Sequence, residues 1–103
     1  MMCEDDYSNG EGFPWVYKEL KIGKLIGTPV AGTATSVWWE RQIDSDIVFG
    51  IPQVGKIDRR GKYTENNELF PDIEVYNMPE DYITGHDRQL EKAIEEMMKN
   101  TAR

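Results

Sequence analysis

The stretch "DDYSNGEGFPWVYKELKIGKLIG", residues 5–27, carries most of the information about the fold. Apolar residues recur in it at the i, i+3, i+4, i+7 spacing of one helix face: Phe13, Val16, Tyr17 and Leu20. Pro14 fits such a helix only if it lies in the first turn. We therefore predict a helix that starts at about Phe13 and stops near Gly23.

Short apolar segments flank this helix. Met1–Cys3 reads as the end of a buried strand, and Lys24–Gly27 reads as another short strand. The order strand, turn, helix, strand is that of a βαβ unit with parallel strands.

The remainder of the chain predicts a β-rich lobe followed by a helix. Residues 28–35 are rich in Gly, Pro and Thr and read as a loop. The predicted later segments are strands over 36–40, 47–51 and 73–75, a polar turn over 58–62, and a helix from Asp87 as its N-cap. Pro52 limits the second of these strands to an edge or an end. The predicted fold class is α/β, as a single domain or a domain fragment over residues 1–103.

Composition excludes some partners. The 103 residues carry 12 basic and 19 acidic side chains, a net charge of −7, which repels phosphate backbones and anionic lipids. We expect no nucleic acid and no membrane partner, and we find neither an apolar run near ~18 residues nor a leader pattern. The one cysteine, Cys3, is expected to be a small buried hydrophobic residue.

Ser8 can be read in two ways. Ser-Asn-Gly, residues 8–10, is typical of a tight turn. A serine between a strand end and a helix start also places its hydroxyl beside free backbone N–H groups, which suit an oxyanion, so Ser8 can also be read as a nucleophile. The only histidine, His86, precedes the last helix in "YITGHDRQLEK" and reads either as a base or as a polar residue near a helix N-terminus.

Two further features have alternative readings. Glu4, Asp5 and Asp6 are adjacent acids without a following ligand pattern, so they form either a cation site or a solvated loop. Trp38 and Trp39 are neighbours in a predicted strand and point to opposite faces, so we expect one in the core and the other at an interface. No metal motif is present, and we expect no cofactor.

Several segments together resemble a known family. They are "DDYSNGEGFPWVYKELKIGKLIGTPVAGT", "VWWE", "FGIPQVG" and "YTENNELFPDIEVYNMPEDYITGHDRQLEKAIE", which start at residues 5, 37, 49 and 63. In this order they resemble the C-terminal part of the tricorn and C-terminal processing peptidase family of serine peptidases. The resemblance implies a fragment of the parallel strand and helix spiral that Clp protease and crotonase share.

The resemblance also implies roles for particular residues. Ser8 matches the nucleophile, and the backbone N–H of Asn9 matches one oxyanion donor, where many relatives have Asp. Glu65 matches the glutamate of the tricorn-type Ser-His-Ser-Glu tetrad. The lysine of the processing peptidases aligns with Thr33, which favours the tricorn branch, whose histidine belongs upstream of Ser8.

Two hypotheses follow. The chain is the C-terminal portion of a serine peptidase that cleaves peptides or unfolded polypeptides, with its histidine base supplied from upstream. Alternatively, it is a noncatalytic fragment or an interaction module of the same fold. In both cases we expect a homo-oligomer, because truncation at a strand would leave strand edges and apolar surface exposed.

Overall fold

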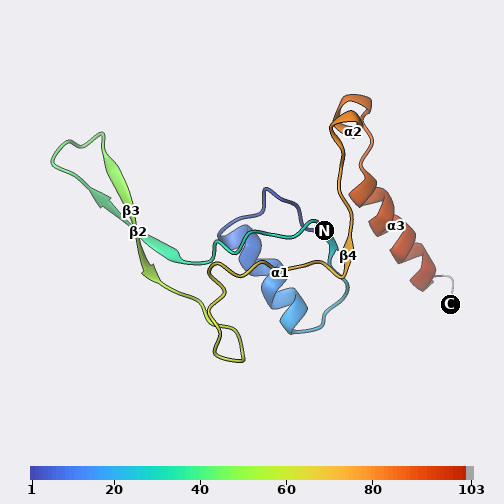
Figure 1. Cartoon of the computed structure of the whole chain (residues 1–103), viewed down its shortest axis with the longest axis horizontal. Helices are drawn as coiled ribbons and strands as arrows, with labels where there is room; N and C mark the ends of the chain where they lie inside the picture. Colours follow the sequence, from blue (N-terminus) through green and yellow to red (C-terminus); the bar gives the residue numbers. More distant parts are fainter. Residues whose placement is uncertain (102–103) are drawn as a thin grey trace.

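The computed structural model describes residues 1–101. The helices and strands follow in the order α1 (Asn9–Glu19), β1 (Ile26–Gly27), β2 (Ser36–Arg41), β3 (Val48–Val54), β4 (Ile73–Glu74), α2 (Pro79–Thr84) and α3 (Arg88–Thr101). The molecule is elongated, with extents of 60 × 39 × 19 Å. Helix α1 lies in the middle, the β2–β3 hairpin extends to one side, and α2 and α3 form an arm on the other (Figure 1).

Helix α1 begins earlier than the apolar spacing predicts. It starts at Asn9, so that Pro14 lies in its second turn and is buried. Proline there removes one backbone hydrogen bond, which would have joined its N–H to the Gly10 carbonyl. The helix ends at Glu19, and Lys21 then takes a positive φ of 52°, which turns the chain toward β1.

The predicted parallel arrangement is confirmed. Met2 pairs in parallel with Gly27, and β1 pairs in parallel with β4, with Ile26 opposite Ile73. Gly27 has a φ of 138°, and a Cβ added there would lie 1.7 Å from the Met2 carbonyl oxygen. Only glycine allows the N-terminal segment to approach β1 this closely.

The core is small and lies against one side of α1. Met2, Leu25, Val30 and Leu69 form its buried cluster, and Trp15 and Tyr17 pack against it. The helix face that identified α1 in the sequence is mostly exposed: Phe13 and Val16 are 71% and 56% exposed, although Tyr17 packs against the core. A helical pattern of apolar residues therefore located the helix without locating its buried face.

Strands β2 and β3 form an antiparallel hairpin of their own, in which every residue of both strands is exposed. Trp38 and Trp39 are 56% and 67% exposed. The expectation that one of them lies in the core is therefore wrong, because the described residues place no second layer over the hairpin. Pro52 lies within β3, on a strand that has a single neighbour, as its missing N–H requires.

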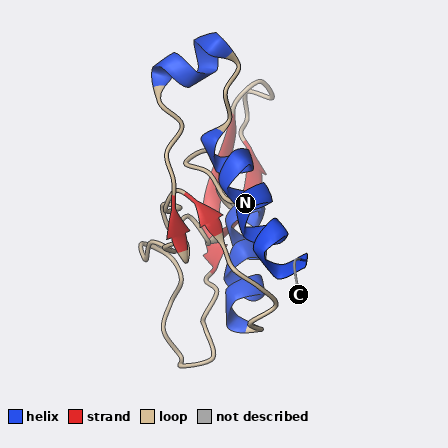
Figure 2. Cartoon of the chain, turned by 90° about the vertical axis from the view of Figure 1, so that its right-hand side faces the viewer, coloured by secondary structure: helices blue, strands red, loops and turns tan. Residues whose placement is uncertain are grey.

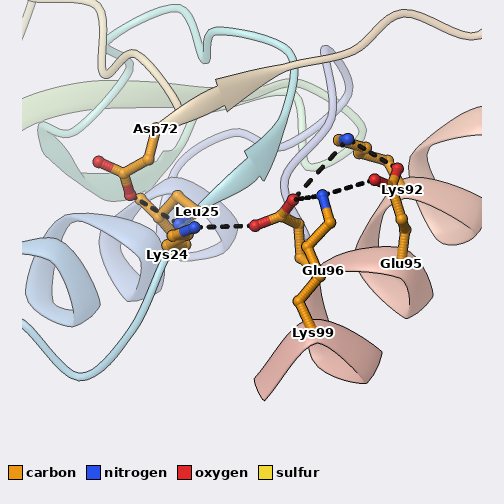
Figure 3. Close-up of polar contacts among 7 residues, drawn as sticks. All are labelled: Lys24, Leu25, Asp72, Lys92, Glu95, Glu96 and Lys99. Atoms are coloured by element: carbon orange, nitrogen blue, oxygen red, sulfur yellow. Dashed lines mark hydrogen bonds and ion pairs between the residues drawn. The ribbon is translucent and has the colours of Figure 1, made fainter. Parts of the chain in front are cut away.

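Helix α3 begins where the sequence predicts and packs against β1 (Figure 2). The Asp87 carboxylate accepts a hydrogen bond from the Leu90 N–H at 3.0 Å, as an N-cap does. Lys24, beside β1, forms a 2.8 Å ion pair with Glu96 of α3 (Figure 3). Helix α2 was not predicted, although Pro79 at its first position is a common start signal.

Candidate active site

Ser8 occupies the residue that precedes α1 and has an unusual backbone conformation. Its φ of 56° and ψ of −114° lie outside the regions that residues with a side chain normally adopt. A serine at this position usually caps the helix with its hydroxyl, but the Ser8 side chain makes no capping hydrogen bond. Ser8 is therefore held in a strained backbone conformation, and its hydroxyl takes no part in capping the helix. Strained backbone conformations of this kind are frequent at functional sites.

The backbone N–H of Asn9 lies at the first position of α1. No carbonyl or side chain within residues 1–101 accepts a hydrogen bond from it. The positive end of the helix dipole adds to the attraction of this N–H group for an anion. Ser8 and Asn9 thus place a free hydroxyl and a free donor at consecutive positions, as an oxyanion site requires.

Glu11 was missed in the sequence and is the best-connected acid of the site. Its side chain is completely buried. One carboxylate oxygen accepts hydrogen bonds from the Thr33 N–H at 2.6 Å and from the Thr33 hydroxyl at 3.2 Å. The other accepts a hydrogen bond from the Trp15 indole N–H at 3.2 Å.

Thr33 joins this acid to the turn. Its Oγ1 accepts a hydrogen bond from the backbone N–H of Ser8 at 3.2 Å. Two hydrogen bonds therefore connect the buried Glu11 carboxylate, through the Thr33 hydroxyl, to the backbone N–H of Ser8. The only sequence signal for it was an acid three residues after an N-cap serine, the spacing of a capping box, whose acid would bond the N-cap N–H directly.

Glu65 lies beside the same loop without touching Ser8. Its Oε2 accepts hydrogen bonds from the N–H groups of Ala34 at 2.8 Å and Thr35 at 2.6 Å. Hydrogen bonds from the Thr35 side chain and backbone hold the pKa of the Glu65 carboxyl below its ordinary value. Glu65 is therefore an ionised acid that fixes residues 34 and 35, directly after Thr33.

A glycine makes this approach possible. Gly32 has a φ of 83°, and a Cβ there would lie 2.6 Å from the Asn67 backbone nitrogen. Asn66 donates its N–H to the Gly32 carbonyl at 2.7 Å. Hydrogen bonds therefore join the Thr33 loop to the Glu65 segment before Thr33, at Gly32, and after it, at residues 34 and 35.

His86 is not brought to this turn. It lies between α2 and α3, with its Nδ1 3.6 Å from a carboxylate oxygen of Glu91. In Figure 1 this arm is well separated from the first turn of α1. Of the two readings of His86, the polar residue near a helix N-terminus is the one that the structure supports.

The acidic run has local structural contacts. The Asp6 carboxylate accepts a hydrogen bond from the Cys3 N–H at 3.0 Å, and the Glu4 carboxylate accepts one from the Thr28 hydroxyl at 3.0 Å. Residues 1–101 contain no group of three or more His, Cys, Asp or Glu side chains arranged to hold a metal ion.

Cys3 is only half-buried and is a free thiol. Over residues 1–101, no helix is both long and apolar enough to cross a bilayer.

A pocket of about 370 Å³ lies along α1. Its lining is mostly apolar, with Trp15, Val16, Leu20 and Ile57, and also includes the charged residues Glu19, Lys56, Asp58 and Arg59. The volume falls in the range of small-ligand pockets. It begins one helical turn after Ser8, at Gly12, whose N–H donates a hydrogen bond to the Ser8 carbonyl at 3.1 Å.

Comparison with known proteins shows the family to which this chain belongs. The family model of peptidase family S41 matches residues 1–75, so the chain belongs to this family. Over 93 residues, 89% of this chain, it is 31% identical to the tricorn protease of Thermoplasma acidophilum. It is 30% identical over the same length to a tricorn protease homolog of Saccharolobus solfataricus.

The fold of this chain also matches that of a solved structure from the same family. A crystal structure of the tricorn protease matches 97% of this chain with a TM-score of 0.87 and 30% identity. The chain therefore has the α/β fold of the corresponding part of that protein. It spans only 10% of that chain and 9% of each of the two sequence relatives.

Proposed function

We propose that this chain supplies the nucleophile and one oxyanion donor of a tricorn-like serine peptidase. Ser8 Oγ attacks the carbonyl carbon of a peptide bond, and a histidine from outside residues 1–103 accepts the hydroxyl proton. The same histidine then protonates the leaving amine, and water releases the acyl group. The observation that carries this proposal is the strained Ser8 turn, with its hydroxyl outside the helix cap.

Asn9 and Glu65 have supporting roles in this mechanism. The Asn9 N–H donates to the oxyanion that forms on the carbonyl oxygen, and removal of one such donor typically costs about 10²–10³ in kcat. Because the donor is a backbone group, asparagine serves as well as the aspartate of many relatives. Glu65 positions the loop of Thr33, which holds the Ser8 backbone.

The substrate class follows from the same proposal. Peptides or unfolded polypeptides are the expected substrates, because the nucleophile turn lies beside a pocket of about 370 Å³ that is lined mostly by apolar residues. We also propose a homo-oligomer. The radius of gyration is 17.4 Å, against about 13 Å for a compact domain of this length, and the apolar β2–β3 hairpin is exposed on both faces.

The second candidate is a noncatalytic interaction module. It is favoured by the position of His86, the chain's only histidine, between α2 and α3, whereas Ser8 precedes α1. Both candidates predict that the 103-residue chain alone hydrolyses no peptide. They differ in what happens when an upstream histidine is supplied.

The test extends the reading frame upstream and assays peptide hydrolysis with and without the added segment. The proposal predicts that the longer protein is active, that Ser8→Ala removes the activity, and that Ser36→Ala, at the exposed start of β2, retains it. An inactive longer protein that carries the histidine segment would leave the module as the function. Activity that survives Ser8→Ala would also refute the proposal.

A further inference from the structure

We infer that Lys56 selects substrates with an acidic residue next to the scissile bond, an inference that rests on the proposed peptidase function. Lys56 lines the pocket beside α1, with its ammonium at the end nearest Ser8. The pocket would receive the side chain of a substrate residue that flanks the bond attacked by Ser8.

Three residues of the pocket wall are tied to the nucleophile turn. Gly12 donates its N–H to the Ser8 carbonyl at 3.1 Å. Lys56 Nζ lies 3.5 Å from the Asn9 side-chain oxygen. Ala34 directly follows Thr33, whose hydroxyl holds the Ser8 N–H. A peptide bound at Ser8 would therefore lie within one side-chain length of this pocket.

The Lys56 ammonium is placed to act on such a side chain. The residue as a whole is half-buried, and within the described part of the chain its ammonium forms no ion pair with an acid. A Cβ built on Gly12 would lie 3.5 Å from Lys56 Nζ, so the ammonium lies over a residue that has no side chain. The space that a side chain at position 12 would take is left free.

Within the described residues, neither acid that lines the pocket, Asp58 or Glu19, forms an ion pair with Lys56. The Asp58 carboxylate accepts hydrogen bonds from the N–H groups of Arg60 and Lys62, both at 2.8 Å, and so is engaged within its own turn. Glu19 is the last residue of α1 and lies about 15 Å along the helix axis from Asn9. Arg59 adds a second cation to the wall.

An ammonium in a partly apolar pocket favours a carboxylate over its neutral amide. Hydrogen bonds to charged groups typically contribute enough to change an equilibrium about tenfold to a hundredfold. Glutamate should therefore be preferred to glutamine of the same shape by about tenfold or more at low salt. Because Lys56 is only half-buried, salt should weaken the preference.

Binding can be tested without catalysis. The 103-residue chain, labelled with ¹⁵N, is titrated at low salt with Ac-Ala-Glu-Ala-NH2 and with Ac-Ala-Gln-Ala-NH2. The Glu peptide should shift the amides of Gly12 and Lys56 and bind about tenfold more tightly. Lys56→Met should remove the difference, whereas Lys21→Met, a lysine outside this pocket, should keep it. Equal binding of the two peptides would overturn the inference.

Cleavage then separates the inference from the proposed function. In the upstream-extended peptidase, kcat/KM is measured for peptides with Glu, Gln, Leu or Lys on either side of the scissile bond. We expect Glu to be preferred on one side, and Lys56→Glu to reverse the preference toward Lys. Cleavage without preference for Glu would refute the role of Lys56 and leave the peptidase standing. Failure to cleave any peptide would refute the peptidase, and the titration would still decide the binding preference.

Discussion

The Thr33 N–H donates a 2.6 Å hydrogen bond to the buried carboxylate of Glu11, and the Thr33 hydroxyl accepts the N–H of Ser8. A carboxylate enclosed within α1 thus sets the position of a loop, and the loop sets the backbone of the nucleophile. Burying a charge without partners would be costly, so Glu11, Thr33 and Trp15 must be assembled together.

Removal of the Glu11 charge should destabilise the fold. Glu11→Gln retains one carbonyl oxygen but places an amide NH2 against an N–H group that, in the parent protein, donates to the carboxylate. We expect the free energy of unfolding to fall by about 1–3 kcal/mol. Chemical denaturation measures it, and Glu68→Gln, at an exposed acid, is the matched control. Equal stabilities of the two variants would show that the Glu11 contacts are not formed in solution.

Thr33 should matter to the reactivity of Ser8 more than to stability. Thr33→Val keeps the shape of the side chain but removes the hydroxyl that accepts the Ser8 N–H. In the upstream-extended peptidase we expect kcat to fall about tenfold or more, since small misplacements of a nucleophile are costly. Thr33→Ser keeps the hydroxyl and should restore most of the rate. The hydrogen bond would be irrelevant if both variants matched the parent.

Acid should detach α3. Hydrogen bonds from the Lys24 and Lys99 ammonium groups lower the pKa of the Glu96 carboxyl from 4.5 to about 2. Because the folded-state pKa is lowered, the stabilisation is fully present above pH 4.5 and is lost as the pH falls toward about 2. Hydrogen exchange of α3 amides should accelerate over this window.

Glu96→Gln should remove this pH dependence, because the amide does not titrate. Glu80→Gln, at an exposed acid of α2, should retain it. A pH profile of α3 exchange that is identical in all three proteins would contradict the role of the Lys24–Glu96 pair.

The hairpin should drive self-association. A two-stranded hairpin is marginally stable alone, and exposed apolar side chains lie on both of its faces. We expect sedimentation velocity to show dimers or larger species at high concentration, and the double variant Trp38→Thr with Trp39→Thr to weaken them. A monomeric parent chain at high concentration would count against the proposed homo-oligomer.

Most of the backbone order could be predicted from local patterns. Asp87 and the apolar stripe after it predict α3, and the order strand, helix, strand predicts the parallel pairing that joins Met2 to Gly27. Helix α2 was missed because its six residues are too few for a periodic pattern, although Pro79 and Asp81 carry start signals. Short helices depend on flanking contacts, here the Arg88–Asp81 ion pair at 2.6 Å.

Long-range contacts explain the other differences. Nothing near Glu11 in sequence indicates that its partner would be Thr33, because their contact depends on a loop that Gly32 folds against the segment of Asn67. The adjacent Trp38 and Trp39 predict one core residue between them, because a single strand does not reveal whether a second layer covers it. The local sequence leaves Ser8 open between a turn residue and a nucleophile, and the resemblance favours the nucleophile. Its backbone strain is visible only in the structure.

Covalent labelling tests the role of Ser8 most directly. The upstream-extended peptidase is treated with a fluorophosphonate, and the modified residue is located by peptide mass spectrometry. We predict stoichiometric modification of Ser8, its loss in Ser8→Ala, and none in the 103-residue chain alone, which lacks an upstream base. Modification at another residue, or stoichiometric labelling of Ser8 in the isolated chain, would contradict the assignment of Ser8 as a nucleophile activated by an upstream histidine.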